Sequence, residues 1–138
     1  TDLRLTCESC HRALIPVLGN GLDAITLALK EKGLLERTLV VAMGEFGRTP
    51  KINQNVGRDH FPRANWCIMA GAGVTPGLLL GGTNDGGTAP DDSTDISPDD
   101  IAATILQSVG IDHHSTYYTS TGRPVDLIPN GTPLAVRS

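Results

Sequence analysis

The side chains that could do chemistry are concentrated in one polar stretch of the sequence, residues 44–62. Its acidic, basic and imidazole groups include Glu45, Arg48, Arg58, Asp59 and His60. Carboxylates and imidazoles are ligands that divalent metals use, and the planar guanidinium of arginine suits phosphate or sulfate oxyanions. Glycines in the stretch would let the backbone approach a ligand closely. The other interpretation is structural: the arginines would form salt bridges with the acids in a solvated loop.

A second candidate lies near the start of the sequence, where residues 7–11 read Cys-Glu-Ser-Cys-His. This is the pattern of c-type haem attachment, in which two thiols bond the haem and the histidine ligates the iron. Cys7, Cys10 and His11 would then carry a haem. The alternatives are the start of a surface helix, or a short disulfide loop that would constrain the chain little.

The elements around the polar stretch suggest how it is positioned. Apolar residues recur every three or four positions over residues 14–32, which predicts a helix that begins near Pro16 and ends at Gly33. Residues 38–43 are apolar on both faces, which is typical of a strand in a parallel sheet covered by helices. The polar stretch thus begins at the C-terminal end of a buried strand, where open α/β folds place their sites.

Further elements complete the predicted fold. Strands are expected over residues 65–70 and 78–80, and an acidic, glycine-rich loop over residues 83–95. A helix is predicted to follow Ser97, which has the side chain of an N-cap and precedes a proline and two acids. The fold class is therefore α/β, with helices flanking a mostly parallel sheet. We expect residues 1–138 to form a single segment, the C-terminal part of a larger domain.

Composition argues against two classes of partner. The net charge is −4, aromatic residues make up 4% of the chain, and no basic block is present, so nucleic-acid binding is not expected. No apolar run approaches the roughly 18 residues that a membrane-spanning helix needs, so no membrane partner is expected. Cys67 lies in an apolar run and is predicted to be a core residue.

Several motifs, in order along the chain, resemble a bacterial family of uncharacterised function, DUF1501. The matching segments are residues 33–35 (GLL), 38–41 (TLVV), 44–50 (GEFGRTP), 57–60 (GRDH), 96–112 and 122–125 (GRPV). The family in turn resembles the alkaline phosphatase and sulfatase superfamily. That resemblance implies an α/β fold with a one-metal or two-metal site at the C-terminal edge of the sheet.

In that superfamily a strand ends in an Asp-His-Gly motif whose acid and histidine bind metal. By position, Glu45 stands at the acid and Phe46 at the histidine, with His60 as a later ligand and Asp59 beside it. Phe46 cannot bind a metal, so the resemblance implies a one-metal or reshaped site, holding zinc, calcium or manganese. Arg48 and Arg58 would hold the oxyanion.

The resemblance implies a metal-dependent hydrolase of phosphate or sulfate esters, either small molecules or polymers. The family's upstream Trp-Asp-Thr-His motif is missing from this sequence, and no nucleophile is recognisable, so no catalytic residue is assigned. The first alternative is a non-catalytic binding or structural module of the same fold with a degenerate metal site. The second is the small haem protein. The resemblance also implies export to the periplasm, and exposed strand edges would favour a homo-oligomer.

Overall fold

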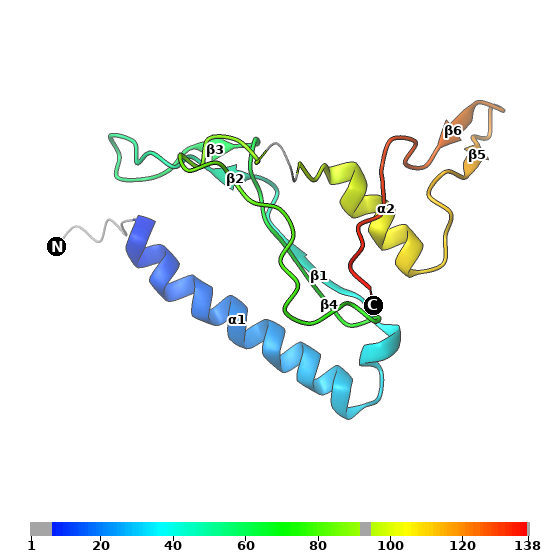
Figure 1. Cartoon of the computed structure of the whole chain (residues 1–138), viewed down its shortest axis with the longest axis horizontal. Coiled ribbons are helices and arrows are strands. Elements are labelled where there is room, and N and C mark those ends of the chain that lie inside the picture. The colour runs from blue at the N-terminus through cyan, green and yellow to red at the C-terminus, as the bar shows by residue number, and fades with distance from the viewer. Residues whose placement is uncertain (1–6, 92–94, 138) are drawn as a thin grey trace.

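The structure is a computed structural model that describes residues 7–91 and 95–137 (Figure 1). In chain order the elements are α1 (Cys7–Glu31), a 3₁₀ turn η1 (Leu35–Arg37), β1 (Val40–Met43), β2 (Gly47–Arg48), β3 (His60–Phe61), β4 (Cys67–Ala70), α2 (Pro98–Ser108), β5 (Thr116–Tyr118) and β6 (Pro124–Asp126). The strands form three separate antiparallel pairs: β1 with β4, β2 with β3, and β5 with β6.

The predicted fold class, an α/β protein with helices flanking a mostly parallel sheet, is therefore wrong for the described residues. Strand β1 pairs with β4 in antiparallel register, with Val40 opposite Ala70 and Met43 opposite Cys67. A parallel neighbour needs a crossover connection, usually a helix. The connection here, residues 44–66, contains the β2–β3 hairpin and no helix, so the chain returns in the opposite direction. The predicted strand at residues 78–80 is also wrong, because that segment is irregular.

Helix α1 and helix α2 lie on opposite sides of the β1–β4 ribbon (Figure 1). Helix α1 begins earlier than predicted, so Pro16 lies inside the helix and not in its first turn. Its end is as predicted: Gly33 has φ +65°, and the N–H of Leu34 donates to the carbonyl of Leu29 at 2.8 Å. Only a narrow face of α1, formed by Leu22, Thr26 and Leu29, is half-buried in its second half.

Helix α2 holds the small buried core. Ser97 caps it as predicted, in a reciprocal capping box with Asp100. The C-terminal segment, residues 131–136, packs along the helix: the hydroxyl of Thr104, which is 1% exposed, accepts the N–H of Leu134 at 2.9 Å. Ala103 and Val136 are the buried apolar residues of this core. The end of the chain therefore completes the packing around α2.

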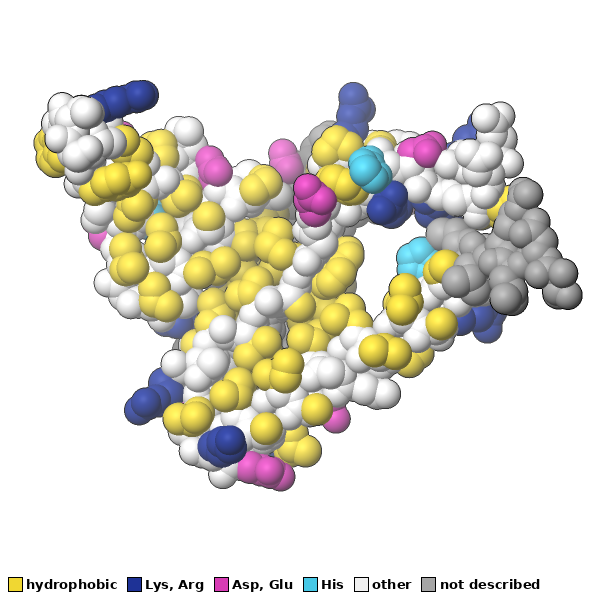
Figure 2. All heavy atoms as spheres, turned by 180° about the vertical axis from the view of Figure 1, so that it is seen from behind, with side chains coloured by type: hydrophobic (Ala, Val, Ile, Leu, Met, Phe, Trp, Pro, Cys, Tyr) yellow, Lys and Arg dark blue, Asp and Glu magenta, His cyan; other side chains and the backbone are white. Residues whose placement is uncertain are grey.

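Much apolar surface stays uncovered. Figure 2 shows hydrophobic side chains gathered over the middle of one face. Ile68 on β4 and Leu14 on α1 are 45% and 65% exposed. By length and composition, Ser9–Glu31 could cross a membrane, which differs from the expectation that no apolar run has the necessary length. Core helices and signal sequences meet the same criterion, so the expected absence of a membrane partner stays a prediction.

Candidate site at the β2–β3 hairpin

The polar stretch predicted to carry the chemistry folds as a short hairpin. Strand β2 pairs with β3, and the register sets Gly47 opposite Phe61 and Arg48 opposite His60. Directly opposed residues in an antiparallel pair project from the same face of the ribbon. Two of the predicted site residues, Arg48 and His60, are thus brought together, and both side chains are exposed.

Gly47 is needed for this pairing because another part of the backbone lies against it. A Cβ atom at Gly47 would lie 1.7 Å from the carbonyl oxygen of Ala64 and 3.1 Å from that of Phe61. No side chain fits there. The lack of a side chain at Gly47 thus makes room for the backbone at Ala64. The sequence had instead suggested that this glycine lets a ligand approach closely.

Phe46 is the residue around which the exposed groups are arranged. Its ring lies 4.1 Å from the ring of His60, centroid to centroid, with the planes tilted by 38°. The guanidinium carbon of Arg48 lies 5.7 Å from the centroid of the Phe46 ring, within the range of a cation–π contact. Phe46, which cannot bind a metal, therefore holds an imidazole and a guanidinium side by side.

The two arginines have different roles. Arg58 is half-buried, and its Nη1 donates to the carbonyl oxygens of Thr49, at 2.6 Å, and Pro50. Arg48 is exposed, and its Nη1 donates to the carbonyl oxygen of Arg58 at 3.3 Å. Most of the N–H donors of Arg48 are left for a ligand. The alternative of salt bridges from these arginines to Glu45 and Asp59 is not seen, since no ion pair joins these four described residues.

The loop between β2 and β3 is organised by Asn53, a residue that the sequence analysis did not single out. Its Oδ1 accepts the N–H groups of Asn55, at 3.0 Å, and Gly57, at 3.1 Å. Its Nδ2 donates to Oδ1 of Asp59 at 2.8 Å. Asparagine commonly bonds to the backbone two residues later in turns, so the spacing of Asn53, Asn55 and Gly57 is the signal that could have identified it.

The predicted metal ligands do not assemble as one centre. Across the described side chains, those of residues 9–91 and 95–137, no three His, Cys, Asp or Glu groups lie close enough together to hold an ion. Asp59 already accepts a bond from Asn53, and the imidazole of His60 lies against Phe46. Binding of zinc, calcium or manganese by Glu45, Asp59 and His60 therefore stays a prediction.

The haem pattern lies in the first turns of α1. Cys7, Cys10 and His11 are spaced by three and four residues, so they share one face of the helix. The side chain of Cys7 lies outside the described residues. Cys10 is half-buried. Haem attachment at these positions stays a prediction.

Comparison with known proteins identifies the family of this chain and no individual relative. No curated protein matches the chain, and no solved structure matches it. One family model does match: DUF1501, described as a protein of unknown function, matches residues 6–135. The match spans both helices, all three strand pairs and the candidate site. The chain therefore belongs to the DUF1501 family.

Proposed function

We propose that this chain binds a phosphate or sulfate ester at the β2–β3 hairpin, with Arg48 and His60 as the contacts to the oxyanion. The observation that carries the proposal is the register that sets these two exposed side chains opposite each other. A guanidinium with several free donors can hold two oxygens of one oxyanion at once. An imidazole next to it adds another donor.

Phe46 supports the proposal because it restricts both groups. A long, exposed arginine side chain loses rotamer freedom when it binds, and this entropy weakens binding. Contact of Arg48 with the Phe46 ring limits that freedom before the ligand arrives. The His60 ring is limited in the same way. The hydrogen bonds of Arg58 and Asn53 keep the loop between β2 and β3 in one conformation.

Hydrolysis of the bound ester is the second candidate function. The resemblance to the alkaline phosphatase and sulfatase superfamily favours it, and in that setting a divalent metal would act as a Lewis acid on the ester oxygen. Binding without hydrolysis is favoured because no three His, Cys, Asp or Glu side chains of the described residues form a group that could hold a metal. The non-catalytic module is therefore our first proposal and the hydrolase our second. Periplasmic location and homo-oligomer formation stay predictions.

Titration calorimetry with an aryl sulfate, an aryl phosphate and a sulfated polysaccharide tests the binding proposal. Arg48→Ala should weaken binding by at least about tenfold, because it removes a charge-assisted hydrogen-bonding group. The Arg48→Lys variant should have an affinity between those of the wild type and Arg48→Ala, since lysine keeps the charge and loses the planar fork of the guanidinium. Arg123→Ala is the matched control, since this exposed arginine lies in the separate β5–β6 turn. Equal binding by the Arg48→Ala and Arg123→Ala variants would refute the proposal.

The two functions separate in a turnover assay. Release of nitrophenol from nitrophenyl phosphate or sulfate, with zinc, calcium or manganese added, would favour hydrolysis if Glu45→Gln and His60→Ala abolish it. Binding without product release favours the non-catalytic module. Product release that survives both substitutions would show that the assigned ligands are wrong.

A further inference from the structure

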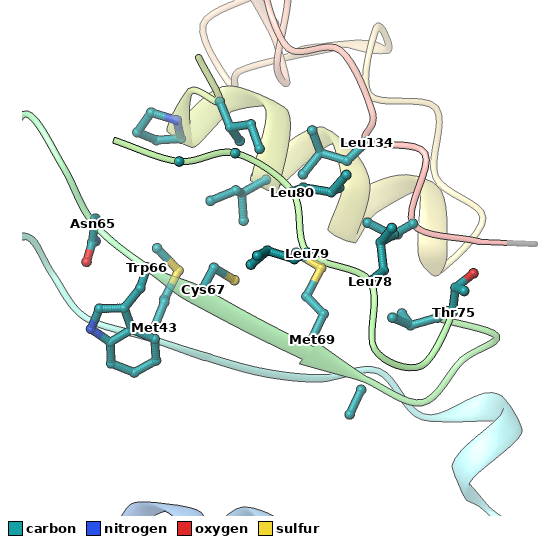
Figure 3. A pocket seen from close by; sticks show the side chains of 18 of the residues that line it. Met43, Asn65, Trp66, Cys67, Met69, Thr75, Leu78, Leu79, Leu80 and Leu134 are labelled. Atoms are coloured by element: carbon teal, nitrogen blue, oxygen red, sulfur yellow. The ribbon is translucent and has the colours of Figure 1, made fainter. Parts of the chain in front are cut away.

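The β1–β4 ribbon borders an open hollow of about 1230 Å³. The hollow is also lined by the irregular segment around residues 78–82, by the N-terminal part of α2 and by Thr26 of α1. The lining is largely apolar and includes Leu78, Leu79, Leu80 and Leu134. Figure 3 shows that sulfur-containing side chains project from the ribbon into this space.

The pairing register gathers the three sulfur atoms. Met43, the last residue of β1, lies directly opposite Cys67, the first residue of β4. Met69 follows Cys67 by two positions, so both project from the same face of β4. Opposed Cβ atoms in such a pair are roughly 4.5–5.5 Å apart, and positions i and i+2 are roughly 7 Å apart along a strand. The flexible side chain of methionine spans such distances easily.

These three residues have the chemistry of one particular class of ligand. Thiolate and thioether sulfurs are soft donors and select soft metal ions, Cu(I) above all, over magnesium, calcium or manganese. No histidine is among the described residues that line the hollow. Met43 is 46% exposed, so its thioether is not enclosed by packing and can reach an ion.

We propose that Met43, Cys67 and Met69 form a binding site for one Cu(I) ion. The Cys67 thiolate and the two thioethers supply three sulfur ligands. As the copper–sulfur bond forms, the S–H bond of Cys67 breaks and its proton passes to the buffer, so the ion replaces a proton and no electron is transferred.

Anaerobic titration with Cu(I) against a chromophoric chelator tests the site. The Cys-Glu-Ser-Cys-His segment could bind Cu(I) as well, so the reference protein is the double variant Cys7→Ser/Cys10→Ser. This reference should bind one equivalent of Cu(I) and release one proton per ion at pH 6. X-ray absorption of the copper complex should show sulfur ligands only.

Substitution at the three positions then locates the ion. Cys67→Ser in the reference background should abolish binding. Met43→Leu/Met69→Leu preserves side-chain volume and removes both thioethers, so it should fold normally and bind at least about tenfold more weakly. Circular dichroism verifies that each variant is folded. The proposal fails if the reference protein binds no Cu(I), or if the leucine variant binds it as tightly as the reference.

Discussion

Replacing Gly47 by alanine is the most direct test of how the candidate site is assembled. The added Cβ would lie 1.7 Å from the carbonyl oxygen of Ala64, a fixed backbone atom. A normal contact requires the two segments to separate by more than about 1 Å, and packing in folded proteins resists such displacements. Strands β2 and β3 contain two residues each, so they have few other hydrogen bonds to preserve their register.

Enlarging a residue where the structure has no room costs about 1–3 kcal/mol, and the backbone clash at Gly47 places this substitution near the upper end of that range. With a urea m-value of about 1–3 kcal/mol/M for a domain of this size, the unfolding midpoint should fall by about 1 M or more. Loss of the Arg48–His60 register should also weaken ester binding.

Urea unfolding followed by circular dichroism measures the effect, and Gly19→Ala is the matched control. Gly19 lies inside α1, and a Cβ atom there would meet nothing within 4 Å. The same chemical change should therefore stabilise the protein by about 0.5–1 kcal/mol, because alanine favours helix. If Gly47→Ala is neutral or stabilising, as Gly19→Ala is expected to be, the close approach of the two backbone segments is refuted.

Three further predictions concern single side chains. Hydrogen bonds from the N–H of Thr132 and, to a lesser extent, from Ser97 lower the pKa of the Asp100 carboxyl. The stability that these bonds contribute should be complete above the unfolded-state pKa of about 4 and should be lost as the pH falls below it. The difference in Tm between the wild type and Asp100→Asn should therefore shrink from pH 6 to pH 2, and a constant difference would contradict this. Arg58→Met leaves two backbone carbonyls without their donor, so a lysine-specific protease should cleave after Lys51 faster than in the wild type, relative to cleavage at the end of α1; unchanged cleavage would show that Arg58 does not close the loop. Burial raises the pKa of the Cys67 thiol, so iodoacetamide should alkylate it more slowly at pH 8 than it alkylates free cysteine, and an equal rate would be inconsistent with that burial.

Local signals in the sequence predicted the elements that depend on neighbouring residues. The N-terminus of α2 follows from Ser97 and the proline and acids after it, and the capping box is present. The end of α1 follows from Gly33. The strand at residues 65–70 is confirmed, with β4 covering Cys67–Ala70.

The direction of the sheet depends on distant pairing and could not be read in the same way. Residues 38–43 are apolar on both faces, a property shared by a parallel strand between helices and by this antiparallel ribbon between α1 and α2. At the site, the polar stretch was identified and its residue types were clear. The partners of Arg58, which are two backbone carbonyls, depend on how the loop closes and leave no pattern in the sequence.

The packing of residues 131–136 against α2 has a consequence for biosynthesis. Leu134 supplies a hydrogen bond to Thr104 across 30 positions of the chain, and Val136 supplies one of the few enclosed apolar side chains. In a nascent polypeptide that does not yet include residues 131–136, α2 lacks these packing contacts. The ribosome must therefore release this region before the helix acquires its native environment, and until then chaperones would meet an unprotected apolar surface.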